Sequence, residues 1–135
     1  MADKLTFSLV SPERELLHGE VDEVVVPSVD GEFGVLPGHA PVLALIKPGV
    51  IKVFDNGAAR RIFVNGGFAD VTPQGLTVLA DEALDLADAA PSAATVEQEI
   101  KDASEDLRIA ESETAKASAS ARLARAEALK AAIAA

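Results

Sequence analysis

The feature that most limits the fold of this chain is the uneven distribution of its glycines and prolines. All 9 glycines and all 7 prolines lie before residue 92, and the 44 residues from Ser92 onward contain neither. Glycine and proline mark tight turns between short strands, whereas the alanine that dominates the tail is the best helix former. The sequence therefore predicts a β-rich domain over residues 1–88 and a helical domain over residues 89–135.

The first domain shows the pattern of short, half-buried strands. Leu5, Phe7 and Leu9 alternate with polar residues, which is the period-two signal of a strand with one buried face. Residues 24–26 form a β-branched run, and we expect Pro27 to end that strand because proline cannot donate to a ladder. Further apolar runs predict strands at residues 42–46, 50–54, 62–65 and 76–80. The predicted class is an all-β sandwich or a flattened barrel.

Several glycine-containing segments predict where this domain turns. Asn56-Gly57 lies between two predicted strands, and this dipeptide is the strongest short signal of a β-hairpin because both residues accept positive φ. Residues 31–34, residues 47–49 and Gly66-Gly67 are also predicted to be turns, since none of them opens a helix as a phosphate-binding loop must. The chain contains no nucleotide-hydrolysing motif.

The alanine-rich tail predicts two helices with apolar faces at helical spacing. The members of these faces are Val96, Ile100, Ala103 and Leu107 in the first helix and Ala119, Leu123, Ala126, Leu129 and Ile133 in the second. A single helix of this length would be about 60 Å long, with an apolar stripe too thin to be stable alone. We therefore predict a hairpin with helices at residues 94–110 and 114–133 and a break near residues 110–114.

The ends of these helices and the strength of their packing leave alternatives open. Ser92 or Thr95 is the candidate N-cap of the first helix, and Ser112 or Thr114 is the candidate for the second. Alanine faces bury little apolar area, so each helix gains only modestly from packing. Two hypotheses follow: a weakly docked hairpin that can detach and extend, or a helical appendage that stays packed.

Charge and composition exclude several classes of function. The net charge is −10, and residues 1–91 carry 14 acidic and 6 basic side chains. Such a body is repelled by nucleic acids and anionic membrane surfaces, and no apolar stretch is long enough to enter and cross a bilayer. The chain has no cysteine, which excludes disulfides and thiolate sites. Only residues 112–135, with 4 basic and 2 acidic side chains, invite an acidic partner.

Catalytic constellations are hard to assemble from these residues. His18 and His39 lie in different predicted turns without metal-ligand spacing. The serines lack a GxSxG elbow, and the numerous carboxylates are typical of a solvated surface. We therefore expect no catalytic residue, metal or cofactor. The alternative is a stand-alone β-sandwich, either a ligand-binding domain or a metal-dependent enzyme that uses His39 and nearby carboxylates.

One segment is too particular for generic β structure. Residues 31–41 read GEFGVLPGHAP, which closely resembles the signature loop of the epsilon subunits of F-type ATP synthases, members of the delta/epsilon family. Residues 46–50 (IKPGV), 66–68 (GGF) and 78–81 (VLAD) are similar to the next landmarks of that family, in the same order. The resemblance is specific through about residue 82, and in architecture it extends over the whole chain.

The resemblance implies a ten-stranded sandwich at the foot of the central stalk of a bacterial ATP synthase. It implies a non-catalytic rotor subunit that couples proton flow to ATP synthesis and binds the gamma subunit and the c-ring. Its place would be peripheral, on the cytoplasmic face of the inner membrane. The family's contact loop corresponds here to Glu32, Phe33, Pro37, Gly38 and His39. We expect its prolines to stiffen the loop and reduce the entropy lost on docking.

The resemblance also implies a regulatory role for the hairpin. In this family the hairpin can swing to an extended position that reaches the alpha and beta subunits and restrains ATP hydrolysis. The basic residues that would meet acidic beta-subunit segments are Arg108, Lys116, Arg122, Arg125 and Lys130. Members that bind ATP carry an Asp and an Arg near the start of the first helix. Residues 96–101 read VEQEIK and lack both, so ATP binding is not expected here.

Overall fold

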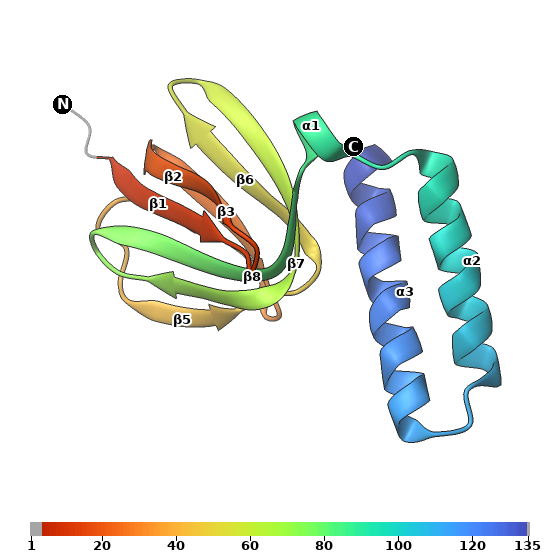
Figure 1. Ribbon diagram of the computed structural model, residues 1–135. Helices are drawn as coiled ribbons and strands as arrows, with labels where there is room; N and C mark the ends of the chain where they lie inside the picture. The colour runs from red at the N-terminus through yellow and green to blue at the C-terminus, as the bar shows by residue number, and fades with distance from the viewer. Residues whose placement is uncertain (1–3, 135) are drawn as a thin grey trace. The chain divides into compact units, whose positions relative to one another are not determined.

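The computed structural model describes residues 4–134, and the chain divides into two compact units, Met1–Asp88 and Ala89–Ala135. The elements appear in Figure 1, with α1 (Leu86–Ala89) as a single turn after the last strand. The strands are β1 (Leu5–Val10), β2 (Glu15–Val21), β3 (Glu23–Ser28), β4 (Gly31–Val35), β5 (Val42–Leu45), β6 (Gly49–Asp55), β7 (Ala58–Val71) and β8 (Gly75–Asp85). The longer helices are α2 (Ala93–Ile109) and α3 (Glu113–Ala134).

The strands of the first unit form one sheet that folds over into two layers. Their order is β2-β1-β8-β7-β6-β3-β4, and β5 also pairs with β7. The first half of β7 pairs with β6, whereas residues 68–71 pair with β5. The two long strands β7 and β8 therefore run through both layers (Figure 1). The all-β sandwich is confirmed, and its described residues, from Lys4 onward, form eight continuous strands. The implied ten are reached only if β7 and β8 are counted once in each layer.

The bend of β7 between the layers lies at Gly66 and Gly67, with φ of 73° and 111°. A Cβ on Gly67 would lie 1.9 Å from the carbonyl oxygen of Leu79 on β8, so only glycine allows this approach of the two backbones. The prediction of a turn at this pair was wrong. The two glycines curve a continuous strand instead of reversing the chain.

The hydrophobic core lies in the first unit, as the alternating strand pattern predicted. Leu5, Phe7 and Leu9 of β1 are completely buried, which confirms that strand. The predicted hairpin is confirmed as well, because β6 and β7 pair antiparallel and close through Asn56 (φ 52°) and Gly57 (φ 82°). The core also includes Val24, Val26, Val35, Ile51, Ile62, Val64, Val71, Leu76 and Val78.

Two further local predictions in this unit were wrong. Pro27 does not end a strand: it lies inside β3 and pairs with Glu32 of β4. β6 pairs with β3 only as far as Val25, and the carbonyl of Pro27 accepts a bond from the Lys47 amide at 3.1 Å. The strand can therefore include Pro27, because no hydrogen bond to β6 requires an N–H at this position. Residues 31–34, predicted as a turn, form most of β4, and β2 and α1 were not predicted at all.

The second unit is a pair of antiparallel helices joined by residues 110–112 (Figure 1). Ser92 is the N-cap of α2, because its Oγ accepts a bond from the Thr95 amide at 3.1 Å. Ser112 has the same role for α3 through the Ala115 amide, at 3.0 Å. The buried side chains of the pair are Val96, Ala103, Ala119, Ala126, Leu129 and Ala132. Over residues 4–134, every helix falls short of the length or apolar character needed to cross a membrane.

Candidate docking surface

A tight turn follows β4 and carries three of the predicted contact residues. The His39 amide donates to the Leu36 carbonyl at 3.1 Å, with Pro37 and Gly38 between them. Gly38 has φ of 84°, so proline and glycine occupy the positions that a type II turn favours. The Gly38 amide also donates to the Pro73 carbonyl at 3.0 Å, which ties this turn to the β7–β8 connection. The predicted stiff loop is thus shorter than residues 31–41, because its first half is β4.

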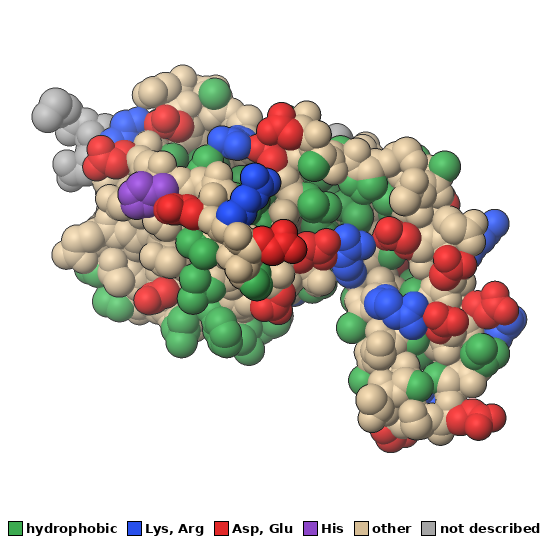
Figure 2. Space-filling model, in the orientation of Figure 1, with side chains coloured by type: hydrophobic (Ala, Val, Ile, Leu, Met, Phe, Trp, Pro, Cys, Tyr) green, Lys and Arg blue, Asp and Glu red, His purple; other side chains and the backbone are tan. Residues whose placement is uncertain are grey.

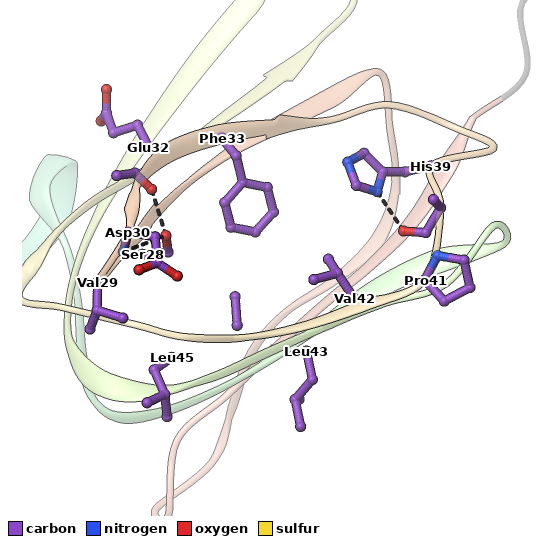
Figure 3. A pocket seen from close by; sticks show the side chains of 13 residues that line it. Ser28, Val29, Asp30, Glu32, Phe33, His39, Pro41, Val42, Leu43 and Leu45 are labelled. Atoms are coloured by element: carbon purple, nitrogen blue, oxygen red, sulfur yellow. Dashed lines mark hydrogen bonds between the residues drawn. The ribbon is translucent and has the colours of Figure 1, made fainter.

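The turn stands at one end of a groove between the edge strands β4 and β5 (Figure 3). The groove has a volume of about 540 Å³ and is lined by residues 28–33 and 39–45. Phe33 points into the groove, whereas Glu32, its neighbour on the strand, points away from it, as strand alternation requires (Figure 3). The five predicted contact residues therefore lie together around this edge of the sandwich, some inside the groove and some outside.

Local hydrogen bonds hold both rims of this groove. His39 Nδ1 donates to the Ala40 carbonyl at 2.7 Å, and its ring lies 6.3 Å from that of Phe33. On the opposite rim, Ser28 Oγ donates to the Gly31 carbonyl at 2.6 Å and accepts from the Asp30 amide at 3.2 Å. Because these bonds are made within the chain, the surface is shaped before any partner arrives.

The charge of the groove is one-sided. Its lining includes the carboxylate of Asp30 but no lysine or arginine, and the Glu32 carboxylate points away from it. Phe33 and Val42 contribute apolar side chains to the lining, whereas Leu45 lies on the other face of β5 (Figure 3). A partner that fills the groove is therefore expected to present apolar side chains and neutral or basic groups, not acidic ones.

Sequence reasoning missed an apolar stripe on the adjoining outer face. Leu45 of β5, Phe68 of β7 and Leu79 of β8 occupy directly paired positions and are 53%, 47% and 52% exposed. Leu43, two residues before Leu45 on β5, is 67% exposed. In Figure 2 hydrophobic side chains gather along the lower margin of the sandwich, where Figure 1 places β5. Aligned apolar side chains of this size in the open mark an interaction surface.

A signal for this stripe was present in the sequence. Residues 42–46 are all apolar, so this predicted strand shows no alternation of apolar and polar residues. A strand with two apolar faces is expected to be covered on both sides. Ala44 of β5 packs against the core, whereas Leu43 and Leu45 on the other face of the strand are exposed.

A serine, a histidine and a glutamate also come together on the first unit. Ser8 Oγ lies 2.7 Å from His18 Nδ1, and Glu15 Oε1 lies 3.4 Å from the same nitrogen. A nucleophile and an orienting carboxylate must contact different ring nitrogens for proton transfer. This cluster therefore does not form a catalytic triad. Within residues 4–134, no three histidine, aspartate or glutamate side chains are grouped so as to hold a metal ion.

The predicted basic contact residues of the second unit all have carboxylate partners within the hairpin. Arg122, Arg125 and Lys130 of α3 reach across to Asp106, Glu99 and Glu97 of α2, at 2.9, 3.2 and 2.7 Å. Arg108 and Lys116 contact Glu105 and Glu113 on their own helices, at 3.9 and 3.8 Å. Figure 2 shows basic and acidic side chains next to one another on the visible face of the hairpin. The hydrogen bond that Lys130 donates to the Glu97 carboxylate raises the pKa of Lys130 above its usual value.

Comparison with known proteins places these features in a family. Residues 4–85 match the model described as "ATP synthase, Delta/Epsilon chain, beta-sandwich domain". The ATP synthase epsilon chain of Maricaulis maris is 60% identical over 88 residues, which cover 65% of this chain and 66% of that protein. The epsilon chain of Hyphomonas neptunium is 56% identical over 100 residues, which cover 73% and 74%. The match to the family model includes the groove and the stripe.

Solved structures show the same fold at lower identity. A chain of the mitochondrial ATP synthase of Euglena gracilis matches with a TM-score of 0.86 and 22% identity, covering 96% of this chain and 81% of that one. A chain from the central stalk and c-ring structure of the Tetrahymena thermophila mitochondrial enzyme matches with a TM-score of 0.67 and 14% identity, covering 97% of both. The sandwich and the helical pair are thus a known combination.

Proposed function

Because this chain belongs to the delta/epsilon family of ATP synthase chains, we propose that it couples proton translocation to ATP synthesis from within the rotor. It is a non-catalytic chain of that complex. The observation that carries the proposal is the match of the whole β-sandwich, residues 4–85, to the family model. The alternative of a stand-alone enzyme or ligand-binding domain has no support among these relatives.

The apolar stripe supports docking on the gamma subunit of the central stalk. Leu45, Phe68 and Leu79 form a row across three strands, and an interface with a stable partner has such an apolar centre. The surface is carried by a sheet whose other face is the hydrophobic core, so little order is lost on binding. We infer that the gamma subunit covers this stripe in the complex.

Binding to purified gamma subunit tests this inference. Phe68→Asp would bury an unpaired charge at the centre of the interface, and we expect the dissociation constant to rise at least about thirtyfold. Ala59→Asp is the matched control, because it adds the same charge to an exposed position of the same strand, away from the stripe. Unchanged binding of Phe68→Asp, measured by calorimetry, would contradict docking through the stripe.

The edge around the groove supports contact with the c-ring. Glu32 is exposed and the turn at Pro37-Gly38 is held by backbone bonds, so both can meet a partner without rearrangement. The chain has no cysteine, so a cysteine at Glu32 gives a unique crosslinking site. We expect Glu32→Cys to crosslink to the c-ring in the assembled enzyme and Glu13→Cys, on the β1–β2 connection, to give no such product. A crosslink to the c-ring from Glu13→Cys but not from Glu32→Cys would contradict this contact.

We also propose that the hairpin restrains ATP hydrolysis by bringing its basic residues to the alpha and beta subunits. A chain that stops after Asp88 keeps the complete sandwich and loses α2 and α3. We expect assembled enzyme with this shortened chain to hydrolyse ATP faster than the complete enzyme. If the rate does not rise, the hairpin is not an inhibitor in this enzyme. The proposed location is peripheral, on the cytoplasmic face of the bacterial inner membrane.

A further inference from the structure

The two helices of the hairpin carry opposite charge. Residues 92–111 have 6 acidic and 2 basic side chains, and residues 112–135 have 2 acidic and 4 basic ones. The structure turns this difference into cross-helix ion pairs along the hairpin, among them those of Arg122, Arg125 and Lys130. Arg122, Arg125 and Lys130 lie beyond the first two turns of α3. Each of them contacts a carboxylate of α2 within the hairpin.

Apart from these ion pairs, the interface between α2 and α3 buries little apolar area, so the ion pairs matter more to its stability. Four of the six buried side chains of α2 and α3 are alanines, and an alanine removes little apolar area from water. The side chain of Arg125 is only 24% exposed in its pair with Glu99, so it is screened less than a free surface arginine. Because the apolar contribution is small, even weak charge pairing changes how firmly α3 is held against α2.

We propose that Glu97, Glu99 and Asp106 of α2 act as an internal substitute for an acidic partner and mask the basic face of α3. The partner that this face fits is an acidic helical segment, because α2 shows the kind of surface it accepts. Arg122 and Lys130 donate to carboxylates of α2 in the closed hairpin, and the same donors would have to turn toward the carboxylates of such a segment, so the two contacts compete. This inference rests on the proposed contact of the hairpin with the catalytic subunits.

In this arrangement the carboxylates of α2 and those of a partner segment compete for the basic side chains of α3, and the hairpin opens when the partner wins. Neutralising the three carboxylates of α2 should free the basic face of α3 without any change to the basic residues themselves. Raising the salt from about 0.1 M to about 1 M shortens the screening length from about 10 Å to about 3 Å. Salt should therefore open the hairpin of the natural chain and have less effect once the three acids are neutral.

The distance between the free ends of the helices in the full chain measures this opening. Ala94→Cys and Ala131→Cys place labels at exposed positions away from the connecting loop. We expect Glu97→Gln, Glu99→Gln and Asp106→Asn together to raise the ratio of open to closed hairpin about tenfold. The matched control is Glu105→Gln, Glu111→Gln and Glu113→Gln, which removes the same charge from the hairpin and leaves Glu97, Glu99 and Asp106 in place. Equal opening in both would overturn the proposal.

A charge exchange separates specific pairing from general destabilisation. Glu97→Lys alone should open the hairpin, because Lys130 then faces a like charge. Adding Lys130→Glu should close it again, since the pair is restored with its polarity reversed. Failure of the second substitution to restore closure would contradict the pairing, even if either single variant proved poorly folded.

The assembled enzyme connects the pairing to its consequence. With the three neutral substitutions in α2, ATP hydrolysis should fall, by at most about tenfold, because a tenfold higher ratio of open to closed hairpin leaves more of α3 free to reach the catalytic subunits. If the labels report opening while hydrolysis stays unchanged, the masking is supported and the inhibitory contact in the proposed function is rejected. If the labels report no opening, the masking itself is overturned, whatever the hydrolysis rate.

Discussion

The β-sandwich and the helical hairpin of this chain are held by different kinds of contact. The sandwich encloses large apolar side chains, including Phe7, Ile51 and Leu76, and pairs every strand with at least one other. The hairpin buries mainly alanines and is fastened by ion pairs at its surface. Burial of large apolar groups stabilises strongly and is nearly independent of salt, whereas exposed ion pairs stabilise weakly and are screened by salt.

The difference suggests a division of work between the two units. A sheet with a dense core and a braced edge is suited to a permanent interface, because its surface keeps one shape. Two helices with a thin apolar interface are suited to exchange partners, because another surface can offer comparable contacts. The predictions below test whether the two units differ as much as their contacts indicate.

The largest effect is expected in the core of the sandwich. Phe7→Ala removes a completely buried ring and should lower the free energy of unfolding by about 3–5 kcal/mol. Phe68→Ala removes the same ring from the 47% exposed stripe and should lower it by less than about 1 kcal/mol. Urea denaturation measures both, and similar losses would show that the stripe is part of the core and not a free surface.

A somewhat smaller effect is expected where β7 crosses between layers. Gly67→Ala places a methyl group against the Leu79 carbonyl and keeps a positive φ, so we expect a loss on the order of 2 kcal/mol. Gly57→Ala is the control, because Gly57 also has positive φ but nothing within 4 Å of an added Cβ. In thermal unfolding, Gly67→Ala should therefore lose more stability than Gly57→Ala, because it adds a steric clash to the backbone strain that both variants share. Equal losses would mean that the close approach of β7 and β8 is relaxed.

In the hairpin a single cap should matter less than the core does. Ser92→Ala removes the acceptor of the Thr95 amide at the start of α2, and we expect a local loss of about 1 kcal/mol. Hydrogen exchange of the Thr95 amide should accelerate about fivefold. Ser104→Ala, an exposed position inside the same helix, should leave exchange unchanged or slow it, because alanine is the better helix former. Acceleration in both variants would indicate fraying of the whole helix.

The smallest effect is expected from an exposed charge cluster on the sandwich. Lys4 contacts Asp22 and Asp55 at 2.7 and 2.6 Å, and the bond from Lys4, then that from the Asn56 amide, lowers the pKa of Asp22 below 3.8. A lowered carboxyl pKa adds stability that is complete above pH 3.8 and is lost as the pH falls through the lowered value. In an NMR titration Lys4→Gln should move the pKa of Asp22 upward. No movement would show that Lys4 is solvated there.

Much of the fold could be predicted from short segments. The alternation of Leu5, Phe7 and Leu9 placed β1, and Asn56-Gly57 placed the β6–β7 hairpin, because both signals act within a few residues. The contact edge at Glu32 and His39 was located through the GEFGVLPGHAP resemblance, not through its chemistry. Its role in docking stays a prediction.

Other features could not be predicted because they depend on residues far apart in the sequence. Gly66-Gly67 has the composition of a turn, and only the pairing of β7 with β8 makes it a bend. Pro27 was predicted to end a strand, but it lies inside β3, where the pairing with β6 had already ended at Val25. The stripe of Leu45, Phe68 and Leu79 joins three strands, so no single segment contains it.

The sequence by itself determined that this chain has a β-rich part and a helical part, because glycine, proline and alanine act through local backbone preferences. It also determined the opposite charges of the two helices. Only the tertiary structure decided which carboxylate meets which arginine, which strands pass through both layers, and which apolar side chains stay in the open. Those outcomes depend on register and packing between distant segments, and side-chain type alone does not specify them.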